Sequence, residues 1–140
     1  RDSNYAALGC SAFPGCYADE FWPPMDFAEG FTLWRGLGIN YEFGVLENDA
    51  RAAIHMSHRI GALVTLVTLG VLIWRLMSRE AGMGMLGGGM LILLLTQIGL
   101  GITNVLAHLP LPVAVAHNGV AALLLATLCV LCWQVYRHET

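Results

Sequence analysis

One long stretch of this chain carries no charged side chain. Residues 81–136 contain no aspartate, glutamate, lysine or arginine. A soluble domain of this size needs charge on its surface, so such a stretch predicts segments that lie within a membrane. The composition agrees, because 56% of the residues are hydrophobic, only 12% are charged and the mean hydropathy is +0.62. We therefore expect an all-α integral membrane protein.

Three apolar runs are long enough to cross the ~30 Å of a bilayer's hydrocarbon core as helices. We expect them at about residues 50–77, 83–107 and 112–136. Asn48 or Asp49 can cap the first run. Glycines at the start of the second run, and again near residues 99–101, permit close helix contact. Two prolines in the linker 108–112 separate the second run from the third. The sequence thus divides into a polar region, 1–48, and a transmembrane bundle, 49–140.

Basic residues predict the orientation. Arg75, Arg79 and Arg137 lie at the same side of the predicted bundle, and positively charged residues favour the cytoplasmic side. Residues 1–48 and the linker 108–112 then lie outside the cytoplasm, with the C-terminus inside. No basic patch suggests nucleic acid as a partner. The chain starts at Arg1 without a signal peptide, and we expect it to be the C-terminal piece of a longer membrane protein.

The polar region contains a pair of cysteines and an amphipathic pattern. Cys10 and Cys16 bracket a Pro-Gly turn signal, and residues 1–48 contain neither a histidine nor a third cysteine that could complete a metal site. A disulfide is favoured over a redox or metal pair if this side of the membrane is oxidising. Phe27, Phe31 and Trp34 share one helical face. This short helix is predicted either to lie on the lipid surface or to pack on the bundle ends.

Three histidines at the outer ends of the first and third runs form the candidate site. His55 and His58 are three residues apart and share one helical face, and His117 lies at a compatible depth. Imidazoles are costly inside a membrane, so they usually face a bundle interior and have a function there. Two of them on parallel helices can ligate haem iron, with Arg59 or Arg51 near the propionates. The alternative is hydrogen bonding between helices, and spacing alone leaves His55 and His58 interchangeable.

Other polar residues in the spans carry weaker signals. Cys129 and Cys132 have C-x-x-C spacing, but we expect them to be small buried residues. His108 and His138 lie near the ends of the spans and are not assigned to the site. Three amides can join helices or line a cavity, and spacing does not choose between these roles: Gln97, Asn104 and Asn118.

Taken together, these residues resemble the C-terminal half of a bacterial haem A synthase, a relative of the mitochondrial cytochrome oxidase assembly protein. The resemblance covers essentially all 140 residues. The stretches that carry it are SNYA at 3–6 leading to Cys10 and Cys16, PPMDFAEGF at 23–31, AIHMSHR at 53–59, QIGLGITNV at 97–105 and LPLPVAVAHN at 109–118.

The resemblance implies a protein of the bacterial plasma membrane, built from two similar four-helix halves with a haem site in each. In that family the N-terminal half holds the substrate haem O and the C-terminal half holds haem b. The enzyme oxidises a methyl group of haem O to the formyl group of haem A, for use by terminal oxidases. The resemblance assigns His58 and His117 as the axial ligands of haem b and matches Cys10 and Cys16 to a disulfide.

Departures from the family limit what this chain does alone. It has three spans, so one helix of the four-helix half and the whole N-terminal half lie elsewhere. The position of the family's proposed catalytic glutamate is occupied by His55, which favours electron transfer over substrate oxidation in this half. We expect the fragment alone to be inactive. The partners implied are the N-terminal half, haem O, an electron donor, haem O synthase, membrane lipid and a second copy of the protein.

Two other functions fit the same residues. One is a bis-histidine b-type cytochrome that transfers electrons without modifying haem. The other is a structural assembly factor without haem.

Overall fold

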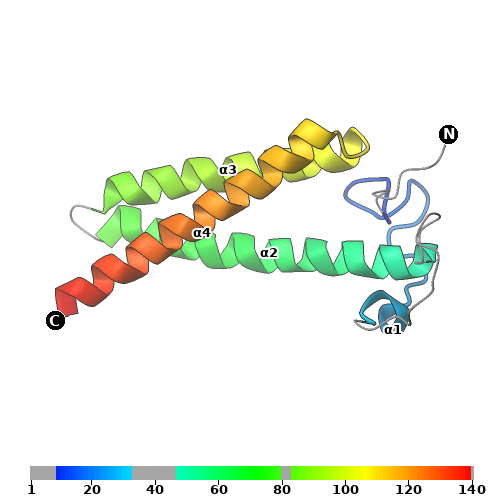
Figure 1. The fold of residues 1–140 in the computed structure, drawn as a ribbon, viewed down its shortest axis with the longest axis horizontal. Coiled ribbons are helices and arrows are strands. Elements are labelled where there is room, and N and C mark those ends of the chain that lie inside the picture. The colour runs from blue at the N-terminus through cyan, green and yellow to red at the C-terminus, as the bar shows by residue number, and fades with distance from the viewer. Residues whose placement is uncertain (1–8, 33–46, 80–82, 140) are drawn as a thin grey trace, which may run out of the picture. The chain divides into compact units, whose positions relative to one another are not determined.

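The structure is a computed structural model, and it describes residues 9–32, 47–79 and 83–139. Within these ranges the chain forms helices and no strands (Figure 1). The helices are α1 (Phe27–Gly30), α2 (Asn48–Arg79), α3 (Gly84–Leu106) and α4 (Leu111–Glu139).

The three long helices confirm the predicted spans. Asn48–Ser78, Gly84–Leu106 and Leu111–Arg137 are each long and apolar enough to cross a membrane, with mean hydropathies of 2.0, 1.9 and 2.0. Each begins and ends within a few residues of the predicted bounds. A helix suits this environment because it satisfies the backbone hydrogen bonds within the segment, where lipid offers none. The prediction of an all-α chain with three spans is therefore confirmed.

The predicted amphipathic helix is present as a single turn, α1. The carboxylate of Asp26 caps it by accepting a hydrogen bond from the Glu29 backbone N–H, at 2.8 Å. Phe27 and Phe31 are exposed, whereas Trp34 lies outside the described residues. The choice between a lipid-surface helix and a loop helix stays open.

The chain divides into two compact units, which are described separately. The first contains Arg1–Leu63 and Thr103–Pro110. Its small core joins the disulfide loop to the first turns of α2, and the buried members are Cys10, Cys16, Ala52 and Met56. Gly9 makes this packing possible, because a Cβ there would lie 2.2 Å from the carbonyl carbon of Arg51. The loop backbone thus rests directly on the backbone of α2.

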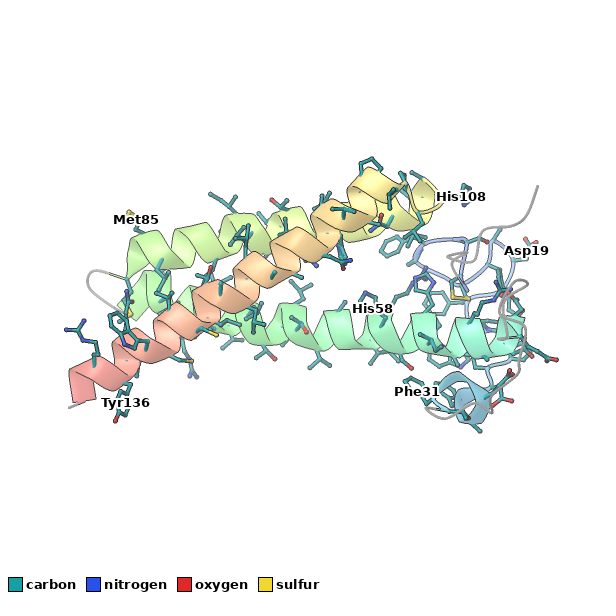
Figure 2. All side chains as sticks on the ribbon, viewed as in Figure 1. Asp19, Phe31, His58, Met85, His108 and Tyr136 are labelled. Carbon is teal, nitrogen blue, oxygen red and sulfur yellow. A yellow bond between two sulfur atoms is a disulfide. The ribbon has the colours of Figure 1, made fainter. Side chains whose placement is uncertain are left out.

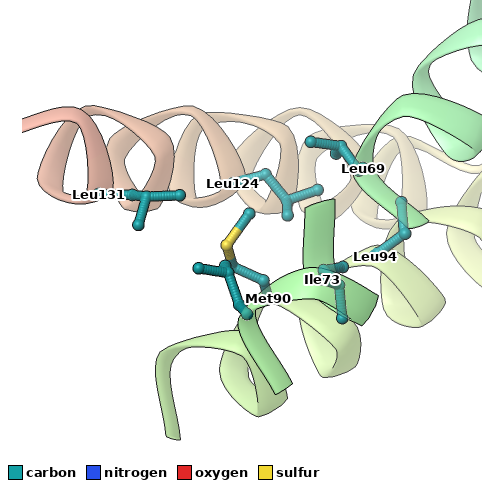
Figure 3. Packing of buried hydrophobic residues seen from close by; sticks show 7 residues of the cluster. Leu69, Ile73, Met90, Leu94, Leu124 and Leu131 are labelled. Atoms are coloured by element: carbon teal, nitrogen blue, oxygen red, sulfur yellow. The ribbon is translucent and has the colours of Figure 1, made fainter. Parts of the chain in front are cut away.

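The second unit contains Val64–Ile102 and Leu111–Thr140. Its core draws on three helices, with buried side chains Leu69, Ile73, Leu76, Met90, Leu94, Leu124 and Leu131 (Figure 3). Gly87 lets α3 pack closely against α2, because a Cβ there would lie 2.9 Å from Cγ of Met77. Within this unit, the predicted close contact at the glycine-rich start of the second span is confirmed.

A tight turn ends α3 at the predicted linker. The His108 N–H donates to the Val105 carbonyl at 3.3 Å, and the Leu109 N–H donates to the Asn104 carbonyl at 2.7 Å. These two bonds satisfy carbonyls that the helix end would leave unpaired. His108 and Leu109 take positive φ angles of 56° and 61° to make them. Pro112 then lies in the first turn of α4, where proline is tolerated.

Candidate functional site

His55 and His58 lie on α2 in the first unit, and their side chains have different surroundings. His55 is partly buried, and its Nδ1 accepts a hydrogen bond from the Cys10 backbone N–H at 3.1 Å. A neutral imidazole that accepts at Nδ1 carries its proton on Nε2. His58 lies about one turn further along α2, with an exposed side chain (Figure 2). The structure therefore separates two histidines that spacing left interchangeable.

Arg59 binds the disulfide loop. Its Nη1 donates to the carbonyls of Pro14 and Gly15 at 3.1 and 2.8 Å, and its Nη2 donates to the carbonyl of Ala12 at 2.7 Å. The guanidinium carbon also lies 5.8 Å from the centre of the Phe13 ring. A planar guanidinium suits this arrangement because it directs several donors at once. Arg59 is thus held by the loop, and its contact with a haem propionate stays a prediction.

The loop that Arg59 holds is closed on itself. Cys10 and Cys16 are both fully buried and their sulfur atoms are bonded, seen as the yellow bond in Figure 2. The Ala12 N–H also donates to the carbonyl of Cys16 at 3.1 Å. His55 and Arg59, one turn apart on α2, therefore attach a closed loop to one helix face.

His117 lies on α4 in the second unit and rests against α3. Its Nε2 is 3.2 Å from Nε2 of Gln97. A Cβ built on Gly101 would lie 3.2 Å from its Cε1, so the ring occupies the space that a side chain at 101 would need. Gln97 and Gly101 are four residues apart and share one face of α3. Of the two roles left open for Gln97, the structure shows the contact between helices.

The two parts of the candidate site belong to different units. His58 is in the first and His117 is in the second, so their ligation of one iron stays a prediction. In the described parts of the chain, no group of three or more His, Cys, Asp and Glu side chains is arranged to hold a metal ion. Bis-histidine haem needs only two imidazoles from the protein, so the chemistry of the available donors fits that group.

The remaining candidates give mixed outcomes. Cys129 and Cys132 are free thiols with exposed side chains, so the prediction that they are buried is wrong for this chain by itself. No described part of the chain packs over these two side chains of α4. Asn104 is buried, and its Oδ1 has no hydrogen-bond partner in the described part of the chain. His108 is exposed, and the side chain of His138 lies outside the described residues.

Sequence reasoning missed two contacts: the one between Gln97 and His117, and the one between Arg59 and the loop carbonyls. The contact between Gln97 and His117 has a sequence signal, because Gln97 and Gly101 place a polar side chain and a position without a side chain on one helical face. The contact between Arg59 and the loop has no such signal, because every residue has a backbone carbonyl. Both join residues that are far apart along the chain.

Comparisons with known proteins agree on one family. A family model described as cytochrome oxidase assembly protein matches residues 2–129. The heme A synthase of Shewanella oneidensis is 46% identical over 128 residues, which are 90% of this chain and 38% of that protein. The chain thus spans less than two-fifths of the length of this relative. No solved structure matches the chain.

Proposed function

This chain belongs to the cytochrome oxidase assembly protein family, and from that premise we propose that it is the haem b-carrying part of a haem A synthase. The observation that carries the proposal is the match over residues 2–129, which includes both His58 and His117. The chain is a multi-pass membrane protein. The proposed activity of the whole protein is oxidation of a methyl group of haem O to the formyl group of haem A.

We assign His58 and His117 as the axial ligands of haem b. Two observations support this choice. His55 already accepts a hydrogen bond at Nδ1 from the Cys10 N–H, which makes His58 the better ligand on α2. Gly101 leaves space for the His117 ring against α3. Haem with two imidazole ligands supplies one-electron transfer when bound. Arg59 stays the proposed partner of a haem propionate.

The proposed orientation is that predicted by the arginines. Arg75 and Arg137 would mark the cytoplasmic side of the bacterial plasma membrane, with residues 1–48 outside. An external loop would also be in the compartment where a disulfide between Cys10 and Cys16 persists. The proposed partners are the rest of the same protein, haem O, an electron donor, haem O synthase and a second copy.

A second candidate is a b-type cytochrome that transfers electrons without modifying haem. The observation in its favour is His55, which stands three residues before His58 where the resemblance implies a glutamate in the substrate-binding half. Its contact with Cys10 ties it to the loop. Both candidates use the same two ligands and differ in whether haem A is made.

Expression of the full-length protein in a host that produces haem O tests these proposals by pigment analysis. The synthase proposal expects haem A to form. Bound haem b without haem A would contradict it and favour the cytochrome. A purified protein without a Soret band would instead favour the haem-free assembly factor.

The ligand assignment has its own test. His58→Ala and His117→Ala should each remove the low-spin haem b signal of this part of the protein. His108→Ala is the matched control, because His108 is exposed at the turn after α3, and it should retain the signal. Retention of the signal in both ligand variants would show that the assignment is wrong.

A further inference from the structure

The contact between Gln97 and His117 indicates which nitrogen of the imidazole accepts a hydrogen bond. The nearest atoms are the amide nitrogen of Gln97 and Nε2 of His117, 3.2 Å apart. An amide nitrogen donates hydrogen bonds and does not accept them. In the orientation that the structure gives the carboxamide, Nε2 must therefore be the acceptor. The proton of the neutral ring is then on Nδ1, and Nε2 carries the ring's in-plane lone pair.

That lone pair is what an axial ligand offers to iron. It can accept the hydrogen bond from Gln97 or bind a metal, but it cannot do both. We propose that Gln97 is a positioning residue that holds the His117 imidazole against α3 in the haem-free protein and competes with haem for Nε2. This inference rests on the proposed function, since it takes His117 as a haem ligand.

The surroundings of Gln97 make the competition reversible. Its Oε1 is buried and has no hydrogen-bond partner in the described part of the chain. A carboxamide anchored at both ends would be costly to move, whereas displacing this one breaks the single contact with His117 that the structure shows. Gly101 meanwhile leaves the ring room against the α3 backbone, because a Cβ there would lie 3.2 Å from Cε1 of His117.

Two substitutions at residue 97 should change haem affinity in opposite directions. Gln97→Leu removes the competing donor and keeps a similar volume, so affinity at the His117-dependent site should rise about threefold. That factor corresponds to the ~0.6 kcal/mol average of such bonds between membrane helices. The ionised carboxylate of Gln97→Glu has acceptors and no donor. It should draw the imidazole proton to Nε2 and lower the affinity about tenfold or more.

The measurement is a Soret titration of the full-length protein, prepared without haem and titrated with haem. The titration of His117→Ala is subtracted, so that only the His117-dependent site is read. Gln134→Leu is the matched control, because it makes the same exchange on α4 roughly 25 Å along the helix from His117. It should leave the affinity unchanged. The low-spin spectrum of the loaded Gln97→Leu protein should match that of the unsubstituted protein.

The outcomes separate this inference from the function on which it rests. If the unsubstituted protein and His117→Ala titrate identically, the ligand assignment is wrong and the inference fails with it. If a His117-dependent site exists but Gln97→Leu binds haem equally or more weakly, the ligand assignment survives and the competition is overturned. A purely structural role for Gln97 predicts this second result, together with lower thermal stability of the haem-free protein.

Discussion

At the scale of single residues, the structure distinguishes side chains that look equivalent in the sequence. His55 and His58 share a helical face, yet His55 accepts a hydrogen bond from Cys10, 45 positions earlier. Gln97 contacts a histidine 20 positions later. Helical spacing determines which residues share a face, whereas these contacts depend on which segment packs against that face.

Gly101 provides a test of how His117 is held. A Cβ at 101 would lie 3.2 Å from Cε1 of His117, so Gly101→Ala should force the ring to shift away from α3. Overpacking of this kind costs about 1–3 kcal/mol, and we expect about tenfold weaker haem binding at the His117-dependent site. A Soret titration of the full-length protein measures it.

Gly99→Ala is the control for this substitution. A Cβ at Gly99 would meet no described atom within 4 Å beyond its own stretch of α3. Both alanines favour the helix equally, so the difference between the variants isolates the contact with His117. Equal haem affinity in the two variants would contradict the arrangement of Gly101 and His117 described here.

Arg59 provides a test of how the disulfide loop is held. Arg59→Lys keeps the charge but replaces a planar fork of donors by one ammonium group, which cannot reach three carbonyls in the same way. Hydrogen bonds from charged groups contribute about 1.5–3 kcal/mol each. The loss of one should raise amide hydrogen exchange in residues 10–16 about tenfold or more, measured by mass spectrometry.

Arg75→Lys is the matched control, since Arg75 lies on the part of α2 that belongs to the second unit. Its effect on the loop should be negligible. Unchanged exchange in Arg59→Lys would mean that the disulfide and the backbone contact at Gly9 hold the loop without help from the arginine.

At the scale of elements, the glycines of α3 differ in what they do. Gly87, Gly88 and Gly89 are consecutive, but only Gly87 faces α2 at a distance that leaves no room for a side chain. A helix places successive residues about 100° apart, so one of three neighbours meets a given partner. The sequence predicted close contact in this region, and the tertiary structure shows that Gly87 makes it.

Gly87→Leu should therefore separate α3 from α2 in the second unit, whereas Gly88→Leu should not. A leucine at 87 would meet Met77 and Leu76, and overpacking costs about 1–3 kcal/mol. The free energy of unfolding in detergent, followed by circular dichroism, should fall by that amount for Gly87→Leu relative to Gly88→Leu. Equal stability of the two variants would count against this packing.

At the scale of the whole molecule, the chain covers little of its own apolar surface. In the most apolar windows of the three spans, only 17%, 17% and 11% of the residues are buried within the chain. Apolar helices this exposed need lipid or further protein around them. This agrees with a chain that covers 38% of its relative's length.

The proposed orientation can be read by labelling cysteines from outside intact cells. Glu20→Cys and Ser78→Cys are introduced separately into a background in which Cys129 and Cys132 are alanine. Both introduced side chains replace exposed ones. A maleimide that does not cross membranes should label Glu20→Cys directly and Ser78→Cys only after permeabilisation. The reverse pattern would invert the topology.

The sequence by itself determined the fold class and the three spans, because a membrane demands long apolar helices and leaves few alternatives. It also placed histidines in the first and third spans. Only the tertiary structure decided that His55 and Arg59 hold the disulfide loop and that Gln97 and Gly101 hold His117. The physical reason is range. Hydropathy acts on each segment alone, whereas hydrogen bonds and close packing depend on partners that the chain brings together only by folding.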